Sequence, residues 1–66
     1  MKKIYMLNVA NSDNEFQMAF STAEKAQDFV LVNFKNDMPK MLTKDYYTGK
    51  LNSYVIDEMA LDQISF

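Results

Sequence analysis

Residues 15–26, EFQMAFSTAEKA, decide the fold, because a strand pattern gives way to a helix pattern within them. Phe16, Met18 and Phe20 alternate with smaller or polar residues, which is the two-residue period of a half-buried β-strand. Residues 21–24, STAE, then have the form of a capping box, in which the Ser21 hydroxyl and the Glu24 carboxylate cap the first turn of a helix. The sequence therefore predicts a strand over 15–20 and a helix that begins at Thr22.

A second strand is predicted immediately before this stretch, over residues 2–10, KKIYMLNVA. It is rich in β-branched and aromatic residues and is apolar on both faces. One face carries Tyr5, Leu7 and Val9, and the other carries Ile4, Met6 and Ala10. Residues 11–14, NSDN, form a polar turn cluster between the two strands, so we expect a β-hairpin.

Three more segments follow the capping box. A helix is predicted over 22–36, because apolar residues recur at helical spacing and Pro39 disfavours its continuation. Residues 39–51 are predicted to be loose, with a turn at which Gly49 supplies a positive φ. A third strand is predicted over 52–61, and residues 62–66 are expected to add an edge pairing or to fray.

These elements predict an α+β fold with the order ββαβ, in a single domain over residues 1–66. The helix is expected to lie on one face of a small three-stranded sheet. One helix covers only one face, so the second face is left with Ile4, Met6 and Ala19. Met59 or Ile56 joins them, depending on the register of the third strand.

The residue inventory argues against catalysis and against bound cofactors or metals. The chain has no Cys, no His and no Trp, which excludes disulfides, Cys/His zinc sites, thiol nucleophiles and histidine acid–base chemistry. Asp57 and Glu58 are adjacent on a strand and point to opposite faces, so they cannot form one acid–base pair. Residues 11–22 begin like a calcium loop but have Phe16 and Thr22 at its sixth and twelfth positions, so a turn is preferred. We expect a protein that is not an enzyme, with no catalytic, cofactor or metal residues.

Charge and hydropathy limit the partners and the cellular location that we expect. Nine acidic residues against seven Lys give a net charge of −2, the wrong sign for a general polyanion binder. No apolar run approaches the ~18 residues of a membrane span. The apolar run after Lys3 is shorter than the ~7–15 residues of a secretory signal. We therefore expect a cytoplasmic protein with no membrane partner.

Nucleic acid is a weaker alternative partner. Lys40, Lys44 and Lys50 surround Tyr46 and Tyr47, and this mixture of basic and aromatic residues is typical of single-stranded nucleic-acid binding. Two nearby aspartates, the net charge and the absence of Arg argue against it. The loop over 40–50 remains a candidate for weak binding of this kind.

Two motifs carry a resemblance to a known group. Residues 20–26, FSTAEKA, and residues 54–62, YVIDEMALD, resemble those of small ββαβ proteins of unknown function found in bacteriophages and prophages. The resemblance implies the same fold and a viral or mobile-element origin, and it brings no catalytic residues. It directs the expected function towards a phage-type accessory protein in the host-cell cytoplasm. Such a protein binds a host protein, a defence nuclease or a gene-expression factor, and inhibits it by steric blockade.

The expected partner-binding residues lie on the uncovered side of the sheet and in the loose loop. They are Ile4, Met6, Tyr46, Tyr47 and Met59. The chain contains six Met residues, which are over-used on adaptable binding surfaces, and tyrosines make good interface anchors. A self-associating structural protein is the alternative, since the sheet faces or edges of two copies can pair as a C₂ homodimer.

Overall fold

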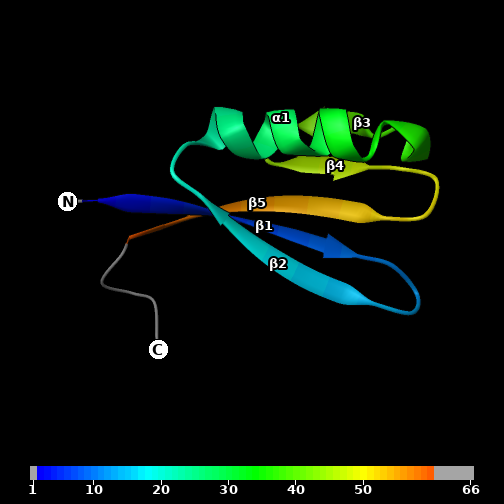
Figure 1. Ribbon diagram of the computed structural model, residues 1–66, viewed down its shortest axis with the longest axis horizontal. Helices are drawn as coiled ribbons and strands as arrows, with labels where there is room; N and C mark the ends of the chain where they lie inside the picture. Colours follow the sequence, from blue (N-terminus) through cyan, green and yellow to red (C-terminus); the bar gives the residue numbers. More distant parts are fainter. Residues whose placement is uncertain (1, 61–66) are drawn as a thin grey trace.

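A computed structural model, which describes residues 2–60, shows one α-helix on one face of an antiparallel sheet (Figure 1). The elements are β1 (Lys3–Ala10), β2 (Glu15–Phe20), α1 (Ala23–Asn33), a 3₁₀ helix η1 (Lys35–Asp37), β3 (Lys40–Thr43), β4 (Tyr46–Thr48) and β5 (Ser53–Ala60). The five strands are ordered β2-β1-β5-β4-β3. The predicted α+β class is confirmed, but the sheet has five strands and not three.

The predicted hairpin forms β1 and β2. Its register runs from Tyr5 opposite Phe20 to Ala10 opposite Glu15. The Asn11 side-chain oxygen accepts hydrogen bonds from the N–H groups of Asp13 and Asn14, each at 2.8 Å, so the polar cluster closes the turn on itself. Local sequence chemistry is therefore sufficient to explain this part of the fold.

β5 lies beside β1 and decides which side chains share a face. Leu7 is opposite Ile56, and Ile4 is opposite Met59. Because directly opposite residues of a sheet point to the same face, Ile56 lies with Leu7 under α1 and is only 4% exposed. Met59 lies with Ile4 on the opposite face, which we call the outer face. The register thus selects Met59 over Ile56 for the outer face.

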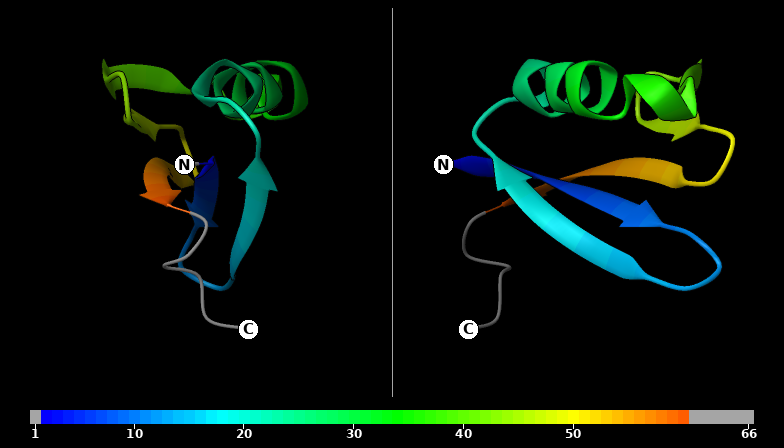
Figure 2. Two further views of the ribbon diagram at one scale, coloured as in Figure 1. Left: turned by 90° about the vertical axis from the view of Figure 1, so that its left-hand side faces the viewer. Right: turned by 45° about the vertical axis from the view of Figure 1, so that its right-hand side comes forward.

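α1 lies over one face of the sheet (Figure 2), and the buried core residues come from these two layers. They belong to the helix and to three strands: Leu7, Val9, Ala26, Val30, Tyr47, Tyr54 and Ile56. A chain of aromatic rings extends the core, with centroids 5.4 Å apart for Phe20 and Phe29, and 5.2 Å for Phe34 and Tyr54. In both views of Figure 2, the outer face carries no helix from residues 2–60.

The helix differs from its prediction at both ends. Its N-cap is Thr22 and not Ser21, because the Thr22 hydroxyl accepts a hydrogen bond from the Lys25 N–H at 3.1 Å. The Ser21 hydroxyl instead accepts a hydrogen bond from the Lys25 ammonium group. The helix ends at Asn33 and not at residue 36, because the chain tightens into η1 and then turns at Met38, which has a φ of 53°.

The segment predicted to be loose contains two strands. β3 and β4 pair with a bulge between Met41 and Thr43, and β4 pairs with β5. Strands of four and three residues interrupted by a bulge are too short to show an alternating pattern. The third predicted strand, over 52–61, corresponds to β5. Its last residue and the predicted tail pairing over 62–66 lie outside the described residues.

The turn between β4 and β5 is built around Asp37, which is only 8% exposed. Its carboxylate accepts hydrogen bonds from the Tyr54 hydroxyl at 2.6 Å, the Leu51 N–H at 2.7 Å and the Asn52 N–H at 3.2 Å. Desolvation raises the pKa of Asp37, but the hydrogen bonds together outweigh it and the net pKa lies below its usual value. Burial, followed by the hydrogen bond to Asp37, raises the pKa of Tyr54 to about 12.

Gly49 is needed for close approach and not for a positive φ, which corrects the prediction. A Cβ at this position would overlap the Asp37 carboxylate and would lie 2.9 Å from the Asp37 carbonyl oxygen. The Lys50 N–H also donates to that carbonyl at 2.8 Å. The absence of a side chain therefore lets the turn close over the aspartate.

Candidate protein-binding surface

An apolar cluster lies on the outer face, at the end of the sheet where β1 begins. Met6 is opposite Ala19 on β2, and Ile4 is opposite Met59 on β5. We call these four residues the outer-face cluster. Ile4, Met6 and Met59 are partly buried and Ala19 is exposed. The structure therefore brings together three of the five residues that the sequence predicted for binding.

Polar residues lie next to this cluster on the outer face, beginning with Asp57, which is opposite Met6. Asn8 donates a hydrogen bond to the Asp57 carboxylate across the β1–β5 pair at 3.0 Å. Beyond that bond, Tyr46 is opposite Val55 and its side chain is 39% exposed. Tyr46, which was predicted to lie in a loop, is thus on the outer face, but the Asn8–Asp57 hydrogen bond lies between it and the outer-face cluster.

Tyr47 is not part of any exposed surface, and its prediction as a binding residue was wrong. It is opposite Tyr54, which places it under α1, and it is 1% exposed. Burial raises the pKa of its hydroxyl, and the charge of Asp45 raises it further. Adjacent strand residues point to opposite faces, so only one of the two neighbouring tyrosines can face solvent on the outer side.

A pocket of about 370 Å³ lies at the margin of the outer-face cluster. It is lined by Lys2, Lys3, Ile4, Ala19, Phe20 and Ser21. Its apolar lining suits an apolar side chain of a partner. Its two lysines suit acidic residues next to that side chain on the partner.

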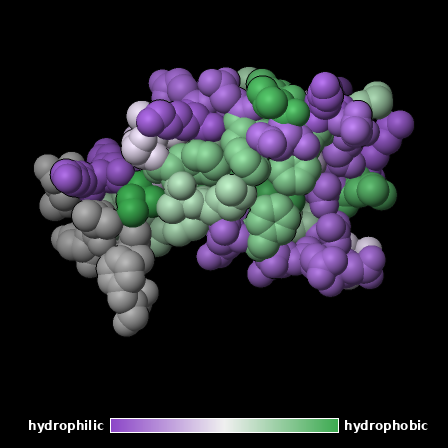
Figure 3. Space-filling model, viewed as in Figure 1, coloured by the Kyte–Doolittle hydropathy of each residue, from purple (hydrophilic) through white to green (hydrophobic). Residues whose placement is uncertain are grey.

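A second apolar area lies along β2, on the side of the molecule shown in Figure 3. Apolar side chains gather there between α1 and β2, with hydrophilic residues around them. Phe16 is 44% exposed, and its ring centroid is 6.3 Å from that of Phe34. We call Phe16, Met18, Phe20 and Phe29 the β2 stripe.

The hairpin of β3 and β4 is less suited to nucleic acid than its sequence indicated. Lys40, Lys44 and Lys50 are exposed. Of the two tyrosines, however, only Tyr46 presents its ring to solvent, because Tyr47 is buried. A single stacking platform is thus left where the sequence indicated two.

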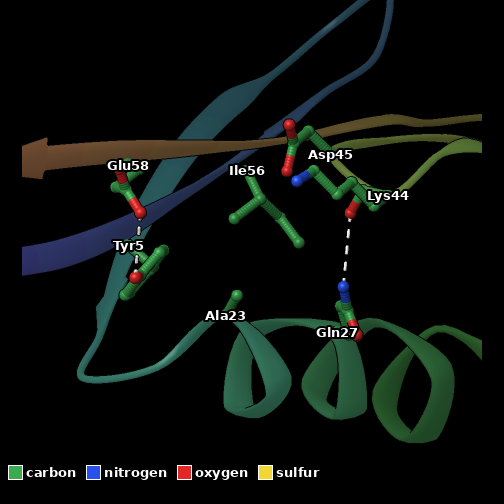
Figure 4. A pocket seen from close by; sticks show the side chains of 7 residues that line it. All are labelled: Tyr5, Ala23, Gln27, Lys44, Asp45, Ile56 and Glu58. Atoms are coloured by element: carbon green, nitrogen blue, oxygen red, sulfur yellow. Dashed lines mark hydrogen bonds between the residues drawn. The ribbon is translucent and has the colours of Figure 1, made fainter.

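The polar residues on the helix side form a pocket of about 250 Å³ between α1 and the sheet (Figure 4). At one end the Tyr5 hydroxyl donates to Glu58 at 3.0 Å, and the Lys3 ammonium group donates to the same carboxylate at 3.2 Å. At the other end Gln27 donates to the Lys44 carbonyl oxygen at 3.3 Å.

Sequence reasoning missed this pocket, since its main polar residues are more than 50 positions apart. The available signal was Glu58, a charged residue on the otherwise apolar face that it shares with Ile56. The hydrogen bond from Tyr5, followed by that from Lys3, lowers the pKa of Glu58, and the Glu58 bond raises the pKa of Tyr5. Both shifts move away from neutrality, so this pair is not suited to proton transfer near pH 7.

Two other kinds of site are not found among residues 2–60. No group of three or more Asp, Glu, His or Cys residues there is arranged to hold a metal ion. No helix in the same part of the chain has the length and apolar character needed to cross a membrane.

The fold and the site together define a small α+β protein with a partly apolar sheet face that no helix of residues 2–60 covers. No protein-family model, curated protein or solved structure matches the chain. The resemblance to small phage and prophage proteins therefore stays a prediction from two sequence motifs.

Proposed function

We propose that this protein is a non-enzymatic binding module that docks the outer-face cluster on another protein and blocks it sterically. The observation that carries the proposal is the position of Ile4, Met6 and Met59 on a sheet face to which residues 2–60 contribute no covering helix. Uncovered apolar residues with a polar border are typical of protein contact sites.

The proposed target is a host protein, either a defence nuclease or a gene-expression factor, as the phage-type motifs suggest. Inhibition by blockade requires no catalytic group and only a face of about 800 Å² on each partner. The pocket beside Ile4, with Lys2 and Lys3 in its lining, favours a target surface that combines an apolar side chain with acidic neighbours.

The test compares Met6→Glu with Val32→Glu. Both add one negative charge at an apolar residue, but Val32 lies on α1 and is 67% exposed. A target captured from host extract is purified, and its binding is measured by calorimetry. We expect Met6→Glu to weaken binding at least 100-fold and Val32→Glu to leave it unchanged.

Circular dichroism shows whether Met6→Glu remains folded, since Met6 is partly buried. If it unfolds, Met6→Ala is used, and we expect this neutral truncation to weaken binding about tenfold. A folded variant of either kind that binds as tightly as the natural sequence contradicts the proposal.

Binding of single-stranded nucleic acid by the β3–β4 hairpin is the second candidate. The observation that favours it is exposed Tyr46, which lies between Lys44 and Lys50 in the sequence. Titration with an oligonucleotide at two salt concentrations tests it. Affinity that falls as salt rises and that is lost in Tyr46→Ala supports it. Absence of binding at low salt excludes it.

A further inference from the structure

β2 is an edge of the sheet whose outward hydrogen-bonding groups are unpaired among residues 2–60. The Asn11 N–H donates to the Asn14 carbonyl oxygen at 2.8 Å, so Asn11 and Asn14 form a hydrogen-bonded pair. Hydrogen-bonded and non-hydrogen-bonded pairs alternate from there along the hairpin. Phe16, Met18 and Phe20 therefore direct their backbone groups towards β1, and Glu15, Gln17 and Ala19 direct theirs away from it. The edge offers three N–H groups and three carbonyl oxygens to another strand.

The two edges of the sheet differ in how well they are protected. β3 has four residues with a bulge, begins with Lys40, and is flanked by Pro39 and Lys44. Lysines, prolines and bulges are devices that prevent pairing between edges. β2 has six residues and contains no Lys, Pro or Gly, and its single charge, Glu15, is at its start. The β2 edge is thus the one that is open to pairing.

The β2 stripe lies beside this open edge. Phe16, Met18 and Phe20 all point to the helix side, and the ring of Phe20 contacts that of Phe29. Phe16 is nearly half exposed although α1 contacts β2 as well as β1 and β5. A strand added at β2 would cover these side chains if its own residues on that side were apolar.

We propose that this strand is β2 of a second copy, paired antiparallel about a two-fold axis at Met18. In this register Met18 is opposite the partner's Met18, and Phe16 is opposite the partner's Phe20. Phe16, Met18 and Phe20 of both strands then meet on the helix side. A register centred on Gln17 instead puts Asn14 opposite the partner's Phe20, which leaves a phenylalanine against a polar side chain.

The side chains on the outer side also agree with the Met18 register. On the outer side Gln17 is opposite the partner's Ala19, and Glu15 is opposite the partner's Ser21, so no like charges meet. The two helices lie on the same face of a ten-stranded sheet.

The small contact between the two β2 strands, which we call the seam, predicts a weak dimer. A six-residue strand is about 20 Å long, so pairing along it buries less than a standard interface of about 800 Å² per partner. We therefore expect a dissociation constant on the order of 10–100 µM, which belongs to the weak class of association. The dimer shares only Ala19 with the outer-face cluster, whose Ile4, Met6 and Met59 lie on β1 and β5.

The first experiment measures molar mass by light scattering from 10 µM to 1 mM. The mass is expected to rise towards twice 7.7 kDa. Phe16→Glu is expected to remain monomeric throughout, and its matched control Leu42→Glu, on the exposed β3 edge, is expected to dimerise as the natural chain does. A natural chain that stays monomeric at 1 mM overturns the proposal, and so does a dimer that survives in Phe16→Glu.

A crosslink provides a second, independent readout should Phe16→Glu fail to fold. The chain has no Cys, so Met18→Cys introduces a single thiol. Opposite residues at such a non-hydrogen-bonded position have Cα atoms about 4.5 Å apart, which is within disulfide range. Oxidised glutathione is reduced as two such thiols join, so we expect rapid dimer formation for Met18→Cys and little for Met41→Cys on β3. Equal crosslinking of the two variants contradicts the proposal.

Discussion

Replacement of Asp37 with asparagine tests whether one buried carboxylate holds the turn between β4 and β5. We expect Asp37→Asn to fold and to lower the free energy of unfolding by about 2 kcal/mol. A 66-residue domain has roughly 3–10 kcal/mol of stability, so the loss is a large fraction of the total.

The magnitude follows from the hydrogen bonds at each oxygen. Asparagine keeps one acceptor for the Leu51 N–H at the position of Oδ1. Its amide nitrogen replaces Oδ2, which accepts from the Tyr54 hydroxyl at 2.6 Å, from the Asn52 N–H at 3.2 Å and from the Asn52 side-chain amide at 3.4 Å. The Tyr54 hydroxyl can turn to accept a bond, and the change from charged to neutral partners costs about 1 kcal/mol. The Asn52 N–H loses its acceptor, which costs about 1 kcal/mol more.

Urea unfolding followed by circular dichroism measures the change. An m-value of about 1 kcal/mol/M for so small a domain turns 2 kcal/mol into a midpoint shift of about 2 M. Asp28→Asn is the control, because it removes the same charge from an exposed position on α1. A difference between the two variants of less than about 0.5 kcal/mol would refute the assigned role of the carboxylate.

The pH dependence of stability provides a second test of the Asp37 carboxylate. The folded pKa of Asp37 lies below its unfolded value of about 3.9, so folding is stabilised by the ionised form. That contribution is present above about pH 4 and is lost as the pH falls through the folded pKa. The stability gap between the natural chain and Asp37→Asn should therefore shrink below pH 4. A stability difference between the two proteins that stays constant down to pH 2 would contradict the conclusion that the charge of Asp37 stabilises the fold.

Four further changes test other parts of the structure. Gly49→Ala is expected to lower stability by about 1–3 kcal/mol, because its Cβ overlaps the buried carboxylate; an unchanged urea midpoint would contradict this. Met38→Gly is expected to raise stability by about 0.5–1 kcal/mol, because Met38 has a φ of 53° and an exposed side chain. Thr22→Ala is expected to lower stability by about 1 kcal/mol and Ser21→Ala by much less, because the Thr22 hydroxyl caps the helix. Equal effects of the two substitutions would contradict the assignment of Thr22 as the N-cap. Tyr54→Phe is expected to reduce the loss of stability between pH 10 and about 12, measured as melting temperature against pH. In this range Tyr54 ionises in the unfolded chain but stays neutral in the folded one, and the raised pKa values of Tyr5 and Tyr47 leave part of the loss in place.

Part of the candidate site was predictable from strand alternation alone. Ile4 and Met6 lie on the same face because they are two positions apart on one strand, whatever that strand pairs with. The choice between Met59 and Ile56 was not predictable, because it depends on which residue of β5 stands opposite Ile4. The choice between Tyr46 and Tyr47 depends in the same way on the register of β4.

The sequence by itself determined the hairpin and the start of the helix within one residue. An alternating strand, the Asn11 turn and a hydroxyl before the helix act between residues a few positions apart, so their chemistry can be read in order along the chain. Only the tertiary structure decided that residues 40–48 form two more strands, and that Asp37 binds a turn 14 residues away. These features depend on residues that only folding brings together. A hydrogen bond or a strand pairing between distant segments produces no repeating pattern in the sequence of either segment, so it could not be predicted from the sequence.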